Sequence, residues 1–303
     1  MTVANTLSRP MSRRTFGIGA SLSIAALGAF RALPTLAHES QLPTLPELTV
    51  VAKDFLFDMP ATIPAGFTTI TLDNQGSASH HAMFAKLNDG VTFEQLLAAP
   101  DFATMAQLGV SLGGPAAEAG MKSSVIMNLE EGNYAILCVI PGPDGMPHYL
   151  MGMASPFEVT AAATPAASAP KADLKVELME MMFHNMPAEV PAGHVTWEVQ
   201  NTGYTTHEML VTRLSDGVTA DMVLEMLTAP PSTATPAADP ASTPNGAPPF
   251  LIVGGVAPMN PGYTTFSLLD LEAGDYVAIC MIPDPETGAP HAAMGMTMPF
   301  TVV

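Results

Sequence analysis

The sequence predicts an all-β protein that consists of two antiparallel β-sandwiches in tandem. The chain has 303 residues, which is enough for two domains of ordinary size. Its second half reproduces the pattern of its first half. Both halves contain short segments in which apolar and polar residues alternate, and such alternation is typical of half-buried strands.

The repeat is in register over its first part. His80 corresponds to His207 at a separation of 127 residues, whereas Cys138 and Cys280 are 142 residues apart. The second copy has therefore gained about fifteen residues before its Cys. The segment at residues 229–249 is rich in Pro, Ala, Ser and Thr, so we expect the insertion there, as a disordered surface loop.

The predicted strands occur in the same order in each repeat, and Pro and Gly turns separate them. In the first repeat they include residues 48–52, 67–72 and 124–129, then the strand from Gly132 to Cys138, then residues 156–159. In the second repeat they include residues 174–178, 194–199 and 265–270, then the strand from Gly274 to Cys280, then residues 299–302.

One short inserted helix is expected in each sandwich, at residues 92–99 and 219–227. Each segment begins with Thr, a favoured N-cap, and has an acidic residue two positions later. The whole chain then divides into a signal segment at residues 1–37, a first domain at 45–160, an Ala/Pro-rich linker at 161–172 and a second domain at 173–303.

The repeats also share a set of metal-ligand side chains. Each contains one Cys, two His and a Met, which provide the thiolate, the imidazole pair and the weak axial thioether of a blue-copper site. Met153 and Met296 follow a Gly, so the chain can reverse there and bring the sulfur to the axial side. The candidate ligands are His80, Cys138, His148 and Met153, and His207, Cys280, His291 and Met296.

A disulfide between Cys138 and Cys280 is the alternative for an exported protein. The two residues occupy equivalent interior positions of separate repeats. Such positions would rarely come within the roughly 6 Å between Cα atoms that a disulfide needs. We therefore expect two metal ligands and no disulfide.

These residues resemble the cupredoxins, the blue-copper family that includes plastocyanin, azurin and the domains of copper nitrite reductases and multicopper oxidases. The resemblance covers nearly the whole chain after residue 37. It implies Greek-key sandwiches, one type 1 copper in each repeat and thus up to two per chain, and a surface position for His148 and His291. Besides the eight candidate ligands, it rests on Asn74, Gly76, Gly132, Tyr134 and Gly152, and on Asn201, Gly203, Gly274, Tyr276 and Gly295.

The resemblance implies one-electron transfer between redox protein partners. An electron carrier or copper-binding protein is expected rather than an enzyme, because Leu137 and Ile279 stand where copper nitrite reductases have a His directly before the Cys. The chain also lacks the His-x-His pairs of multicopper oxidases. Three alternatives stay open: copper sequestration or delivery without redox turnover, an oxidoreductase related to nitrite reductase, and a metal-free interaction module.

Other His and Met residues have simpler interpretations. His81 adjoins His80 but corresponds to Glu208 in the second repeat, so we expect it at the surface. The chain has 22 Met, several of them near His184, and we interpret these as apolar filler, with a soft Cu(I) site as the alternative.

The N-terminus predicts export. A twin-arginine pattern at residues 12–16 precedes an apolar run at 17–30 and a plausible cleavage site at 35–37. The run is shorter than a membrane-spanning helix, so we expect a periplasmic or extracellular protein with no stable membrane span after cleavage.

The charge of the chain restricts its partners. Loss of residues 1–37 removes four Arg and no acid from totals of 10 basic and 28 acidic residues, so the formal charge changes from −18 to −22. Nucleic acid and anionic membranes are poor partners for such a chain, whereas a redox protein with a basic docking face is favoured.

Overall fold

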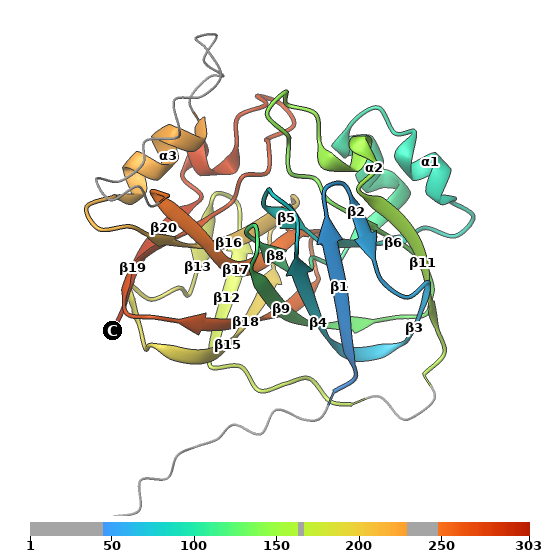
Figure 1. The fold of residues 1–303 in the computed structure, drawn as a ribbon, viewed down its shortest axis with the longest axis horizontal. Helices are drawn as coiled ribbons and strands as arrows, with labels where there is room; N and C mark the ends of the chain where they lie inside the picture. The colour runs from blue at the N-terminus through green and yellow to red at the C-terminus, as the bar shows by residue number, and fades with distance from the viewer. Residues whose placement is uncertain (1–44, 163–166, 229–247) are drawn as a thin grey trace, which may run out of the picture. The chain divides into compact units, whose positions relative to one another are not determined.

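The structure is a computed structural model that describes residues 45–162, 167–228 and 248–303 (Figure 1). The predicted signal segment, four linker residues and nearly all of the predicted insertion lie outside the described residues. The described parts of both repeats belong to one compact unit, residues 42–303. The division into two domains at residues 161–172 stays a prediction. Within the described ranges, no helix has the length and apolar character needed to cross a membrane.

The all-β prediction is confirmed, and one large sheet contains strands from both repeats (Figure 1). Phe266, Ser267 and Leu268 of β18 pair antiparallel with β9 of the first repeat, so the backbone ladder is continuous between the repeats. The sequence did not predict this joint sheet. Its strand order is β13 (Met182–His184), β12 (Leu174–Met179), β15 (Gly193–Asn201), β18 (Thr264–Leu271), β9 (Lys122–Leu129), β4 (Gly66–Asn74), β1 (Glu47–Lys53) and β2 (Leu56–Asp58).

Each repeat has a second sheet of its own, and the Cys ligand follows its central strand. The first contains β3 (Thr62–Pro64), β11 (Ala154–Thr160), β10 (Gly132–Leu137), β6 (Met83–Leu87) and β7 (Gly109–Ser111). The second contains β14 (Glu189–Val190), β20 (Thr297–Val302), β19 (Gly274–Ile279), β16 (His207–Leu214) and β17 (Phe250–Met259). A short ladder pairs β5 (His80–His81) with β8 (Ala116–Ala117).

An apolar core fills the space between the two sheets of each repeat. In the first repeat, Val50 and Ile70 from the large sheet pack with Phe84 and Ile136 from the smaller sheet. This is the sandwich arrangement predicted from the alternating strands. Cys138 and Met153 belong to the same core in the first repeat, and Cys280 and Met296 to the corresponding core in the second.

The helices differ from the prediction in the first repeat, where the described residues form two. Thr92 caps α1 (Phe93–Leu97), as expected, and Gln95 completes a capping box that was not predicted. The additional helix, α2 (Phe102–Leu108), begins after Asp101, whose side chain accepts a hydrogen bond from the Thr104 N–H. In the second repeat α3 (Ala220–Thr228) lies at the predicted helix.

Candidate metal centres

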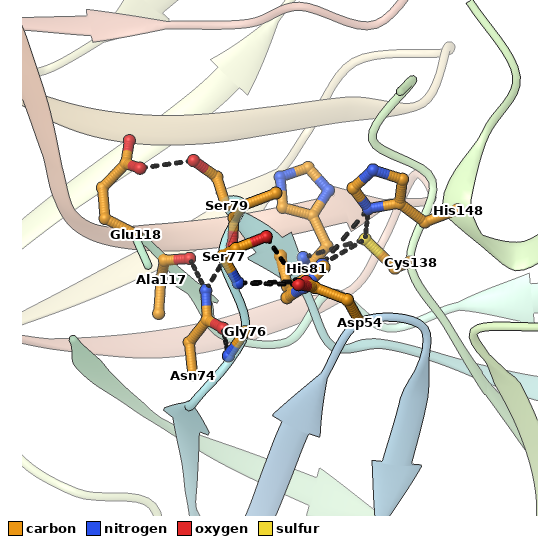
Figure 2. Close-up of polar contacts among 12 residues, drawn as sticks. Asp54, Asn74, Gly76, Ser77, Ser79, His81, Ala117, Glu118, Cys138 and His148 are labelled. Atoms are coloured by element: carbon orange, nitrogen blue, oxygen red, sulfur yellow. Dashed lines mark hydrogen bonds and ion pairs between the residues drawn. The ribbon is translucent and has the colours of Figure 1, made fainter. Parts of the chain in front are cut away.

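The first His ligand of each repeat lies after a loop that a buried Asn braces. The Asn74 amide donates to the Ala78 and Ala117 carbonyls at 2.8 and 2.9 Å, and its Oδ1 accepts the Gly76 N–H at 2.9 Å (Figure 2). The side chain thus ties both ends of the turn that leads from β4 to His80. Asn201 makes the equivalent bonds to Thr205, Met259 and Gly203 in the second repeat.

The Gly of the Asn-x-Gly motif leaves room for an acidic side chain beside the His. A Cβ at Gly76 would lie 2.5 Å from Asp54 Oδ1 and 2.7 Å from His80 Nε2. Asp54 Oδ1 itself is 3.0 Å from His80 Nε2. Hydrogen bonds from Ser77, first its side chain and then its backbone N–H, lower the pKa of Asp54 to about 2, so Asp54 is a carboxylate at neutral pH.

The second repeat builds the same support from different residues. A Cβ at Gly203 would meet Glu180 Oε1 at 2.6 Å. Glu180 lies farther from the His207 ring, at 3.8 Å from Nε2, and Thr205 Oγ1 lies closer, at 3.2 Å. Both repeats therefore place an oxygen at Nε2, which favours a proton there and leaves Nδ1 with a lone pair for a metal.

A turn of 3-10 helix carries the second His of the first repeat. The helix η1 (His148–Met151) ends at Gly152, whose φ of 108° is in the left-handed region that favours Gly. The Met153 N–H then donates to the His148 carbonyl at 3.0 Å, and the Cys138 N–H donates to the Met153 carbonyl at 3.1 Å. These bonds hold the Cys, the second His and the Met on one short loop.

The second repeat repeats this loop. The helix η2 (His291–Met294) ends at Gly295, with φ 109°. The Met296 N–H donates to the His291 carbonyl at 2.9 Å, and the Cys280 N–H donates to the Met296 carbonyl at 3.2 Å. The two predicted ligand loops thus have the same local structure.

In each repeat, two His Nδ1 atoms and one Cys Sγ form a buried triangle. In the first, Nδ1 of His80 and Nδ1 of His148 are 3.2 Å apart, and Cys138 Sγ is 3.7 and 3.5 Å from them. In the second, the Nδ1 atoms of His207 and His291 are 3.1 Å apart, and Sγ of the Cys is 3.5 Å from the latter. All six side chains are buried.

The dimensions of the triangles suit a single metal ion. Bonds of about 2.0 Å to nitrogen and about 2.3 Å to sulfur place three ligand atoms about 3.3–3.8 Å apart at angles between tetrahedral and trigonal. One thiolate with two imidazoles is the plane of a type 1 copper site. The two His–Cys–His groups could therefore bind copper.

The predicted axial Met residues lie inside the protein. Met153 and Met296 are fully buried, each in the apolar core that contains the Cys of its repeat. Met294, two residues before Met296, is 42% exposed. Axial ligation by Met153 and Met296 stays a prediction that their burial favours.

Burial keeps the ligands uncharged before a metal binds. Burial raises the pKa of the Cys138 thiol to about 11. It also raises the pKa of the Cys280 thiol, and the nearby Glu208 carboxylate raises it further. Burial lowers the pKa of His80. Burial, and to a smaller extent the nearby His291, lowers the pKa of His207 to about 4. The imidazoles are therefore neutral ligands, and the thiol proton must leave when a metal binds.

Two expectations about His residues are wrong. His148 and His291 are 2% and 1% exposed, so they do not lie at the surface. Phe55 covers the His148 ring, with centroids 4.9 Å apart. His81, also expected at the surface, is 3% exposed, because it lies against Glu208 of the other repeat. The sequence shows that His81 and Glu208 occupy equivalent positions in the two repeats, but their contact forms only when the chain folds.

Both Cys residues are free, as expected, and both are buried.

No family model and no curated protein matches this chain. Solved structures similar to it include a dithionite-reduced auracyanin from the photosynthetic bacterium Roseiflexus castenholzii, which is 24% identical over 43% of this chain and 94% of its own, with a TM-score of 0.29.

Two larger solved structures are similar over most of the chain. A multicopper oxidase is 12% identical over 87% of this chain and 93% of its own, with a TM-score of 0.24. The copper nitrite reductase from Nitrosomonas europaea is 11% identical over 85% of this chain and 93% of its own, also with a TM-score of 0.24. In this chain, β-sandwiches hold two His–Cys–His triangles that are potential type 1 copper sites.

The prediction that the chain is not an enzyme is wrong as stated. The multicopper oxidase and the nitrite reductase among the similar structures are enzymes. The prediction depended on Leu137 and Ile279 standing at one ligand position of nitrite reductases and on the lack of the His-x-His pairs of multicopper oxidases. A missing ligand at that position excludes only one arrangement of a second copper.

Proposed function

We propose that this chain transfers single electrons through two type 1 copper sites, one in each of two domains at residues 45–160 and 173–303. The observation that carries the proposal is the pair of buried triangles of two Nδ1 atoms and one Sγ. Bound copper would supply a one-electron redox couple. The triangles, with Met153 and Met296 as axial ligands, would hold it.

The surrounding protein supports this chemistry by keeping the ligands in place. Asn74 and Asn201 fix the loops before the first His, and oxygens at Nε2 of His80 and His207 fix the ring orientation. The burial of all six ligands excludes water. A rigid, dry ligand set suits electron transfer because neither oxidation state needs to rearrange it.

Absorption and EPR spectra of the oxidised, copper-reconstituted protein test the proposal. We expect an intense thiolate-to-copper band in the red and two copper ions per chain. Cys138→Ser and Cys280→Ser should each remove about half of the band, because each Cys supplies the thiolate of one site. A colourless protein that binds only Cu(I) would contradict electron transfer and indicate sequestration.

We also propose export by the twin-arginine pattern at residues 12–16, with cleavage after Ala37. Its test is the replacement of Arg13 and Arg14 by Lys, which should retain the unprocessed chain in the cytoplasm. Cell fractionation and the mass of the purified chain measure this. Unchanged export of the double variant would contradict the proposed signal.

A further inference from the structure

A buried contact between the repeats lies next to both metal centres. His81 and Glu208 occupy equivalent positions, each directly after the first His ligand of its repeat. They are 3% and 2% exposed, and His81 Nε2 lies 3.7 Å from Glu208 Oε2. This is longer than a hydrogen bond, so the side chains touch without sharing a proton.

Each of these residues also contacts the Cys of its own repeat. The His81 N–H donates to Cys138 Sγ at 3.3 Å, and the Glu208 N–H donates to Cys280 Sγ at 3.5 Å. Glu208 Oε1 accepts the N–H of Met281, the residue directly after Cys280, at 2.8 Å. A chain of bonds and contacts therefore runs from one ligand sulfur to the other, with a single 3.7 Å step between side chains.

Burial of the His81 and Glu208 side chains in this space lowers the stability of the fold. Among the described residues, none is a hydrogen-bond partner of either ring nitrogen of His81 or of Glu208 Oε2. An unpartnered buried polar group destabilises a fold, and apolar side chains of similar size would avoid this cost. Stability alone therefore does not explain the pair.

The backbone around the pair is fixed by other bonds between the repeats. The Ala257 N–H donates to the Gly114 carbonyl at 2.8 Å, and the Thr265 hydroxyl donates to the Leu112 carbonyl at 2.7 Å. Hydrogen bonds between the repeats thus hold the backbone on both sides of the His81–Glu208 contact.

We propose that His81 and Glu208 form the path by which an electron passes between the two copper sites, so that each site is the redox partner of the other. The inference rests on the proposed function. One electron leaves Cu(I) in one site and reduces Cu(II) in the other. No covalent bond is broken and no proton is transferred.

Intramolecular electron transfer in the two-copper protein tests the path. A flash-generated reductant supplies less than one electron per chain, and freeze-quench EPR follows the redistribution of that electron between the two copper sites. The EPR signal of each site alone is recorded from Cys138→Ser and Cys280→Ser protein. We expect a phase independent of protein concentration that slows about tenfold in His81→Ala and Glu208→Ala. Glu208→Gln keeps the path atoms and should stay within about threefold of the wild-type rate.

Thr265→Val is the matched control. It removes a buried hydrogen bond between the repeats but touches neither Cys, so the rate should not change. The copper-to-copper distance from pulsed EPR should be the same in every variant, which separates a broken path from a displaced repeat.

An unchanged rate in either alanine variant overturns the path, because a path needs both ends. An equal slowing in Thr265→Val also overturns it, since the junction as a whole would then be responsible. If the wild-type protein shows no thiolate–copper band, the proposed function fails and the path fails with it. Copper sites with normal spectra and an unchanged variant rate refute the path alone.

Discussion

At the scale of single residues, the Asn-x-Gly motif performs two tasks in each repeat. Asn74 closes the turn before His80, and Gly76 admits the carboxylate that orients the same His. The sequence identified both residues as part of the ligand pattern. It did not identify Asp54 or Glu180, because these acids come from a different hairpin and meet the His only after folding.

Asn74→Ala should destabilise the protein by about 3 kcal/mol, since it leaves two carbonyls and one N–H of a buried turn without partners. Urea unfolding measures this, and copper titration should show weaker binding at the first site only. Asn201→Ala is the matched control and should weaken the second site instead. Equal weakening of both sites by either variant would contradict the assignment of one brace to each site.

Asp54→Asn should lower the copper affinity of the first site about 10- to 100-fold, because the His80 ring loses the carboxylate at Nε2. Competition with a chelator measures the affinity. Asp58, exposed at the end of β2, is the control position, and Asp58→Asn should leave the affinity unchanged. An unaltered affinity in Asp54→Asn would show that the core alone orients the ring.

At the scale of elements, the strands and ligand loops could be predicted, whereas long-range partners could not. Alternation located β4 and β9, and the ligand pattern of Cys, His and a Met after Gly located the loops that contain η1 and η2, although not their 3-10 helices. The helix α2 was missed, although Asp101 is a favoured N-cap, because only Met105 is buried along it and no periodic apolar face marks it. The burial of His81 depends on the other repeat and leaves no local signal.

The caps of α2 and α3 should respond differently to pH. The Thr104 N–H bond lowers the pKa of Asp101, so its contribution to stability is present above the unfolded-state pKa and is lost as the pH falls through the lower folded-state value. The stability difference between wild type and Asp101→Ala should therefore shrink from pH 7 to pH 3 in urea unfolding.

Thr219→Ala is the control for this comparison. The Thr219 hydroxyl accepts the Met222 N–H at the start of α3 and does not titrate in this range, so its loss should cost about 1 kcal/mol at both pH values. A parallel shrinkage for Thr219→Ala would assign the pH effect to the fold as a whole.

At the scale of the whole molecule, the proposed cleavage after Ala37 leaves a formal charge of −22, which predicts salt-dependent association. Electron transfer to a cationic haem protein should slow as ionic strength rises, because salt screens long-range attraction beyond about 10 Å at 0.1 M. Stopped-flow mixing at 10 and 300 mM salt measures the rate. Reduction by a neutral small molecule is the control, and an equal salt effect on both would exclude steering by charge.

The pairing of β18 with β9 has a consequence for how the protein folds and unfolds. Each half on its own would expose an unpaired edge strand to solvent, and such edges recruit other chains into aggregates. Calorimetry should therefore show one cooperative melting transition for the intact chain, and either half expressed alone should precipitate. We therefore expect the two repeats to unfold together, because each covers an edge strand of the other.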